Sequence, residues 1–230
     1  MCPPIINRIS LKNNAKRTLN QNYIYFFKLF LLTFVVYFIN SVASRNAFNL
    51  EQYLSSEQMN YSIIWNVWSL TDIIFSLIFS VLIISIMFAC IDIQRHKQAL
   101  DNPYVDCLKL FHRREYVAAM IVISLLQTFW IFLWSLLFFI PGIIKSIAYS
   151  QAIYIYRDQL EQGHKISYIQ AITQSRILMN NHKWEYFVLQ LSFIGYWFLT
   201  IITSGITAVW TLPYYQLTMA NYYIALTKQA

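Results

Sequence analysis

Charged residues are scarce in this sequence. Asp, Glu, Lys and Arg make up 12% of its 230 residues, whereas hydrophobic residues make up 58%. Soluble domains carry about 25% charged residues, because they need a polar surface in contact with water. The few charges of this chain are clustered, and the long apolar runs between the clusters are what lipid-facing helices require. We therefore expect an all-α fold, a polytopic bundle of transmembrane helices.

Glycine and cysteine are also few, with four and three residues respectively. The glycines form no G-x-G-x-x-G, P-loop or G-x-x-x-G pattern, which argues against nucleotide hydrolysis. Cys2, Cys90 and Cys107 lack the ligand spacing of a zinc site, and we expect free thiols at or near the cytoplasmic side. The four histidines include no H-E-x-x-H pattern. We therefore expect neither a metal nor a cofactor.

Six apolar runs are predicted to cross the membrane. The first follows a basic segment, residues 1–22, and we interpret it as an uncleaved span because it is longer than the apolar core of a signal peptide. Pro141-Gly142 breaks the third run, which predicts a tight hairpin into a fourth span. Pro213 lies in the last run and should kink its helix. The predicted spans cover residues 23–42, 73–91, 117–140, 143–160, 186–202 and 206–226.

A polar stretch separates the fourth and fifth spans. Within it, Ser167 and Gln170 fit a capping box, in which each side chain satisfies a free backbone donor of the other residue. A helix over residues 168–182 should follow, with one broad apolar face and a face rich in amides. This pattern predicts a helix that lies at the cytoplasmic membrane surface or against the inner mouth of the bundle.

Lysine and arginine alternate between the predicted loops. Four precede the first span, one lies in the first loop, five lie in the second, and four follow the fourth span. Cytoplasmic loops carry the excess of these residues, so both termini are predicted to be cytoplasmic. The net charge of +7 arises from the same clusters beside apolar runs and does not predict nucleic-acid binding. The expected partner is the lipid bilayer, with its anionic headgroups, and protein partners stay open.

Short motifs in a fixed order resemble a known family. Residues 138–145 read F-F-I-P-G-I-I-K, and Tyr149-Ser150 follows. Further along come A-I-x-x-S-R-x-L-M at 171–179, H-K-W-E at 182–185, L-S-F-I-G at 191–195, W-T-L-P-Y at 210–214 and Y-Y at 222–223. Together these motifs resemble domain-of-unknown-function family 975, integral membrane proteins of Gram-positive bacteria. The resemblance implies a multi-span protein of the bacterial plasma membrane and implies no particular activity.

Lys145 is the most pointed candidate for a ligand-binding residue. A charge at the centre of a span costs about 2.5–3.5 kcal/mol and suggests a function. Lys145 either lies near the outer interface and extends to the headgroups, or holds an anionic headgroup or substrate at the outer mouth. A second hypothesis is a polar pathway between helices, with interhelical hydrogen bonding as its structural alternative. Its residues would be Tyr149 on the fourth span and Thr207, Thr211, Tyr215 and Thr218 on the last.

Polar residues also recur along the amphipathic helix and its exit, namely Ser175, Arg176, His182 and Glu185. A histidine near a glutamate can serve general acid–base catalysis. The spacing fits no hydrolase motif, so capping and ion pairing are the favoured roles. The function predicted is non-enzymatic, as a membrane accessory, permeation or immunity-type protective protein. The alternative is a membrane-embedded enzyme, or a subunit, that acts on lipid-linked substrates.

Overall fold

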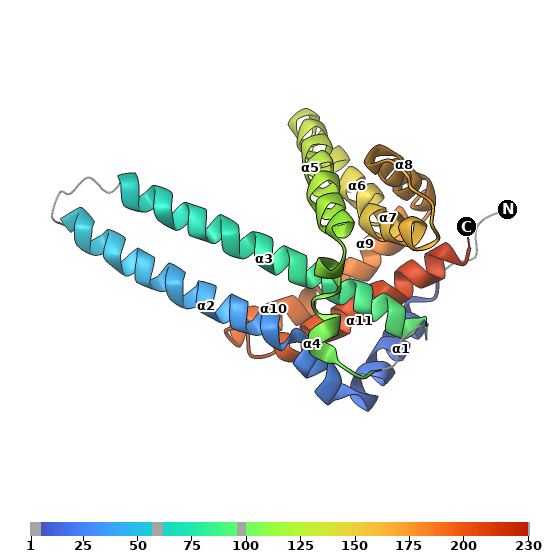
Figure 1. Cartoon of the computed structure of the whole chain (residues 1–230), viewed down its shortest axis with the longest axis horizontal. Helices are drawn as coiled ribbons and strands as arrows, with labels where there is room; N and C mark the ends of the chain where they lie inside the picture. The colour runs from blue at the N-terminus through green and yellow to red at the C-terminus, as the bar shows by residue number, and fades with distance from the viewer. Residues whose placement is uncertain (1–5, 57–61, 96–99, 230) are drawn as a thin grey trace.

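The structure is a computed structural model that describes residues 6–56, 62–95 and 100–229 (Figure 1). These residues form helices and no strands, so the all-α prediction is confirmed. In chain order the helices are α1 (Arg8–Gln21), α2 (Tyr23–Ser56), α3 (Ser62–Gln94), α4 (Pro103–Asp106), the 3-10 helix η1 (Lys109–His112), α5 (Arg114–Leu137), α6 (Phe139–Tyr149), α7 (Ala152–Glu161), α8 (Tyr168–Leu178), α9 (Lys183–Leu191), α10 (Ile194–Ile202) and α11 (Ala208–Thr227).

Four stretches of the described helices are long and apolar enough to cross a membrane. They are Tyr23–Asn46, Leu70–Gln94, Arg114–Leu136 and Lys183–Ile202. These stretches overlap the first, second, third and fifth predicted spans. The composition and these apolar helices together indicate that the chain associates with a membrane. The number of times that it crosses the membrane stays a prediction.

Helices α2 and α3 form a long antiparallel hairpin that projects from the rest of the molecule (Figure 1). They contain 34 and 33 residues, which is about 50 Å each at 1.5 Å per residue. Both helices therefore extend past the ~30 Å hydrocarbon core into the polar stretch between the first two predicted spans. Across the hairpin, Ser44 donates a hydrogen bond of 3.2 Å to Asp72.

Helix α5 leaves the body at a steep angle to the α2–α3 hairpin (Figure 1). Because the helices are not parallel, α5 and the hairpin cannot all stand perpendicular to one flat bilayer.

Helix α11 coincides with the last predicted span, but it lies inside the protein. It packs against α1, α2, α3 and α10, and its buried residues occur all around the helix. Tyr222 and Tyr223 are fully buried, and Pro213 lies within the helix. A helix buried on all sides contacts protein in place of lipid.

The predicted hairpin at Pro141-Gly142 is displaced by a few residues. Helix α5 ends at Leu137, Phe138 is extended, and α6 begins at Phe139. Pro141 and Gly142 therefore lie in the first turn of α6, where a proline is tolerated because its missing N–H is not needed. A Cβ at position 142 would lie 2.1 Å from Ser135 Oγ, so the glycine permits close packing of α6 on α5 and does not make the reversal.

The predicted fourth span is two helices, α6 and α7, with a break at Ser150-Gln151. The Ser175 hydroxyl of α8 fills this break, since it donates to Ala148 O (2.8 Å) and accepts from the Gln151 N–H (3.2 Å). A side chain inserted into the backbone ladder is a common cause of helix kinks.

The capping box at Ser167 and Gln170 is confirmed. Ser167 Oγ accepts from the Gln170 N–H (3.2 Å), and the Ser167 N–H donates to Gln170 Oε1 (2.8 Å). The helix that follows, α8, ends at Leu178, a few residues before the predicted end at 182. Asn181 just beyond it has a φ of 66°, which is incompatible with a continuing α-helix.

Candidate functional site

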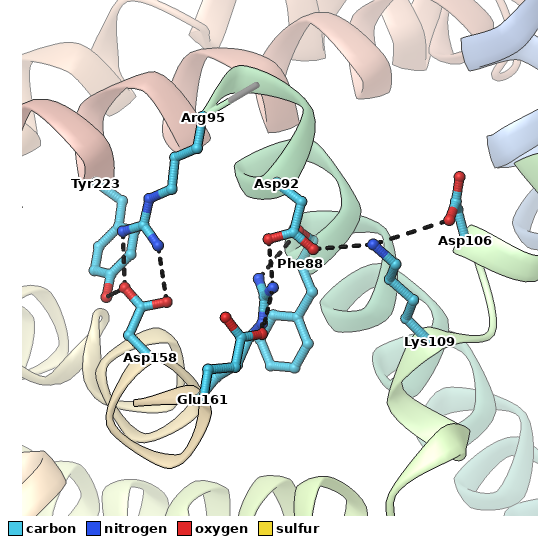
Figure 2. A network of polar contacts seen from close by, with 9 residues as sticks. Phe88, Asp92, Arg95, Asp106, Lys109, Asp158, Glu161 and Tyr223 are labelled. Atoms are coloured by element: carbon cyan, nitrogen blue, oxygen red, sulfur yellow. Dashed lines mark hydrogen bonds and ion pairs between the residues drawn. The ribbon is translucent and has the colours of Figure 1, made fainter. Parts of the chain in front are cut away.

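Two groups of polar residues lie where helices meet. We call the first the charge cluster; its members are Asp92, Arg95, Asp106, Lys109, Arg157, Asp158 and Glu161 (Figure 2). We call the second the Lys145 pocket; it is lined by Trp130, Trp134, Lys145, Tyr149, Ile169, Ile172, Thr173 and Arg176.

Arg157 of α7 is the centre of the charge cluster. It is 4% exposed, and its guanidinium pairs with the carboxylate of Asp92, near the end of α3. It also donates to Glu161 Oε1 (2.7 Å) and to the carbonyl of Phe88 (3.1 Å), and lies 4.7 Å from the centroid of the Phe88 ring. A buried guanidinium is stable only when its donors are satisfied in this way.

Lys109 extends the cluster toward α2. Its ammonium donates to Asp92 Oδ2 (2.9 Å) and lies 3.9 Å from Asp106 Oδ1. The Tyr25 hydroxyl of α2 donates to Asp106, which is 3% exposed. A continuous polar chain thus runs from α7 through α3 and η1 to α4 and α2.

Arg95 and Asp158 form a separate bidentate pair, with N–O distances of 2.9 and 2.7 Å. Burial opposes the charge of Arg95, but the hydrogen-bonded carboxylate outweighs it, so the pKa of Arg95 lies above its ordinary value. The Tyr223 hydroxyl of α11 also donates to Asp158 (2.7 Å), and all three residues line a cavity of about 530 Å³. The pair joins the end of α3 to α7 and α11.

The sequence did not reveal this cluster. Asp92 directly follows the second predicted span, yet it is 6% exposed and paired with two cations. Its main partner lies 65 residues away in the chain, so no local motif could have indicated the contact. The chemistry of the cluster is that of a set of ion pairs that fasten helix ends, because each of its carboxylates lies within 4.0 Å of a cation.

The Lys145 pocket brings together two predicted site residues, Lys145 and Tyr149, and a third residue, Arg176, that was singled out as part of the amphipathic helix. The cavity measures about 260 Å³, and the Lys145 ammonium lies 4.4 Å from the centroid of the Trp134 ring. Lys145 was expected at the outer mouth and Arg176 at the cytoplasmic side. These two placements cannot both hold, because a bilayer is about 30 Å thick and both residues line one small pocket.

The polar residues of α11 do not join this pocket. Thr218 donates to the carbonyl of Tyr214 in its own helix (2.8 Å), and Thr207 lies 3.1 Å from the hydroxyl of Thr200. Thr211 is buried, and Tyr215 packs its ring against Phe193 and Trp197. These contacts favour local hydrogen bonding and packing over a pathway.

His182 and Glu185 lie at the beginning of α9, with 3.0 Å between Nδ1 and Oε2. The Tyr222 hydroxyl donates to the His182 carbonyl (3.2 Å), which ties this turn to α11. The geometry is that of a hydrogen-bonded histidine–glutamate pair at a helix start, which suits a structural role. Cys90 and Cys107 are free, as predicted, and the structure buries both; Cys2 lies outside the described residues.

No group of three or more potential metal ligands gathers within the part of the chain that the structure describes. The fold and site thus define an all-α chain of membrane type with a buried ion-pair cluster and a small cationic pocket. Residues 136–230 match the family described as "Protein of unknown function (DUF975)", which confirms the resemblance seen in the motifs. The match includes α6 to α11 and therefore most of the Lys145 pocket. No curated protein and no solved structure matches the chain.

Proposed function

We propose that this chain is a multi-pass plasma-membrane protein of a Gram-positive bacterium with a non-enzymatic role, as an accessory or protective protein of the membrane. The observation that carries the proposal is the charge cluster. Its acidic side chains are all engaged by cations, and a general acid or base must be free to exchange a proton with a substrate. The ionisable groups at these helix junctions thus serve the scaffold.

Exposed apolar side chains support the membrane location. Leu136 is 76% exposed and Leu125 is 65% exposed on α5, and Phe38 is 68% exposed on α2. Large apolar surfaces of this kind are stable in lipid and mark interaction sites in water.

We further propose that both termini are cytoplasmic. The basic N-terminal helix α1 packs on α11, and Asn221 of α11 donates to the carbonyl of Leu11 (3.2 Å). A reporter active only in the cytoplasm, fused after residue 229 or inserted near residue 164, should be active at both positions. An inactive fusion at either position would contradict this orientation.

Loss of the gene tests the protective role. We expect a deletion strain to become more sensitive to bacteriocins and other membrane-active peptides, and the wild-type gene to restore resistance. An Arg157→Met gene that yields less folded protein should restore it only in part. Unchanged sensitivity across a broad panel of such peptides and envelope stresses would refute the protective role.

An enzyme that acts on lipid-linked substrates is the second candidate, and the Lys145 pocket favours it because the pocket is cationic. The purified chain can be incubated with a panel of phospholipids and lipid-linked phosphates. Turnover that disappears in a Lys145→Gln variant would establish the enzyme and overturn the non-enzymatic proposal.

A further inference from the structure

The Lys145 pocket has walls from three helices. Helix α5 supplies two indole rings, α6 supplies Lys145 and Tyr149, and α8 supplies Arg176 with a short run of apolar and hydroxyl side chains. Because α5, α6 and α8 pack directly on one another, the pocket is a product of the fold and not of one flexible loop.

The pocket carries positive charge without a matching carboxylate. Within residues 6–56, 62–95 and 100–229, neither Lys145 nor Arg176 has a carboxylate oxygen within 4.0 Å. The cations of the charge cluster are all paired with carboxylates. The Lys145 pocket differs from the charge cluster because its cations have no such partner and can therefore attract an anion.

Trp134 holds the lysine in place. The Lys145 ammonium lies 4.4 Å from the ring centroid, a cation–π contact that positions the charge without neutralising it. An ammonium and a guanidinium together suit a phosphate, because the first acts as a point charge and the second offers paired donors. The cavity of about 260 Å³ is slightly below the range of about 300–1,000 Å³ for drug-sized ligands. It is thus large enough for a headgroup and too small for a whole lipid.

Exposed apolar side chains also lie on two of the helices that form the pocket. Leu133 and Leu136 of α5 and Ile144 of α6 are exposed, at 48%, 76% and 44%. Indole rings are enriched at the level of lipid headgroups, where one end of the ring is apolar and the other meets water. A lipid whose phosphate lies beside the cations therefore finds exposed apolar side chains on the same helices for its acyl chains.

We infer that the Lys145 pocket is a binding site for a phosphate group, with Lys145 and Arg176 as the ligands of its oxygens. Two sources share this chemistry, the headgroup of an anionic phospholipid and free inorganic phosphate. The inference is independent of whether the protein is an enzyme, since a bound phosphate can be a structural lipid, a cargo or a substrate.

Native mass spectrometry of the full-length chain in a neutral detergent tests the inference. The probes are phosphatidylglycerol, phosphatidylcholine and inorganic phosphate. Phosphatidylcholine is the control lipid, because its choline cation already balances its phosphate. We expect the wild type to bind one more anion than the Lys145→Gln, Arg176→Gln double variant does. The affinity of this additional site in the wild type should be at least about tenfold higher than any affinity that the double variant retains there. Binding of phosphatidylglycerol alone identifies the lipid as the source, and binding of inorganic phosphate alone identifies the free anion.

Lys12→Gln is the matched control. Lys12 also lies 4.4 Å from an aromatic centroid, that of Phe193, but it lies outside the pocket. We expect this variant to bind like the wild type. Thr173→Trp fills the cavity and keeps both cations, so it should weaken binding even if the double variant does not fold. Equal anion binding by wild type and Thr173→Trp, or an equal loss in Lys12→Gln, would overturn the inference.

Discussion

Replacing Arg157 by methionine should destabilise the protein strongly. The side chains of Arg157 and Asp92 are 5% and 9% exposed, so the pair is buried. Removing one partner of a buried pair leaves a charge without sufficient compensation and costs about 3–5 kcal/mol. Arg157 also bonds to Glu161 and to the carbonyl of Phe88, and both acceptors would lose their donor.

The size of the effect can be measured by thermal unfolding. For a chain of this length, each kcal/mol lowers the midpoint by about 2–4 °C, so we expect a fall of roughly 6–20 °C. Tryptophan fluorescence and far-UV circular dichroism of the purified protein in detergent would follow the transition. Asp92→Asn combined with Arg157→Met should cost less than the two single changes summed, because the double variant leaves no buried charge unpaired within this pair.

Lys165 and Glu115 provide a matched control pair in the same chain. Their closest atoms are 4.0 Å apart, and their side chains are 82% and 54% exposed. An exposed pair of this kind contributes about 0–1 kcal/mol. Lys165→Met should therefore leave the midpoint nearly unchanged. The reasoning is refuted if Arg157→Met lowers the midpoint no further than Lys165→Met does.

Three further predictions follow from local geometry. Gly142→Ala should cost about 1–3 kcal/mol, since the new Cβ would meet Ser135 Oγ at 2.1 Å, and a second change, Ser135→Ala, should restore part of the loss in the same unfolding assay. Ser167→Ala should cost about 1 kcal/mol by removing one half of the capping box, and loss of protection of the first turn of α8 in hydrogen exchange would show where the change acts. Cys107 and Cys90 should not react with maleimide at neutral pH until the chain unfolds. Both thiols are buried, and burial raises the pKa of the Cys107 thiol. Labelling of either cysteine in the native protein would contradict this.

Apolar runs and short capping motifs were enough to predict most helices. The all-α fold and the capping box of α8 depend on residues within a few positions of one another, so the sequence contains the information needed. Even for these helices the predicted ends differ from the observed ones. Pro141 was assigned to a turn, although a proline is also stable in the first turn of a helix.

The candidate site was only half visible in the sequence. Lys145 attracted interest because a charge in an apolar run is costly, and Arg176 because it lies on an amphipathic helix. Nothing in the spacing of 31 positions between them indicates a shared pocket. Only the packing of α8 on α5 and α6 brings the two cations together.

The sequence by itself determined the class of the protein, that of helical membrane proteins. The shortage of charge and the long apolar runs are properties of composition and local sequence, so they do not depend on how the helices pack. Tertiary structure decided which charges are paired and which are open. Arg157 meets Asp92 across 65 residues, whereas Lys145 shares a pocket with Arg176, and among the described residues neither of these two cations has a carboxylate oxygen within 4.0 Å. Charge interactions fall off within several ångströms, so their sign and strength depend on which helix faces meet. The scarce charges of this chain therefore acquire their separate roles only after the helices have packed. Those of the charge cluster join helix ends as ion pairs, and those of the Lys145 pocket remain available to an anion.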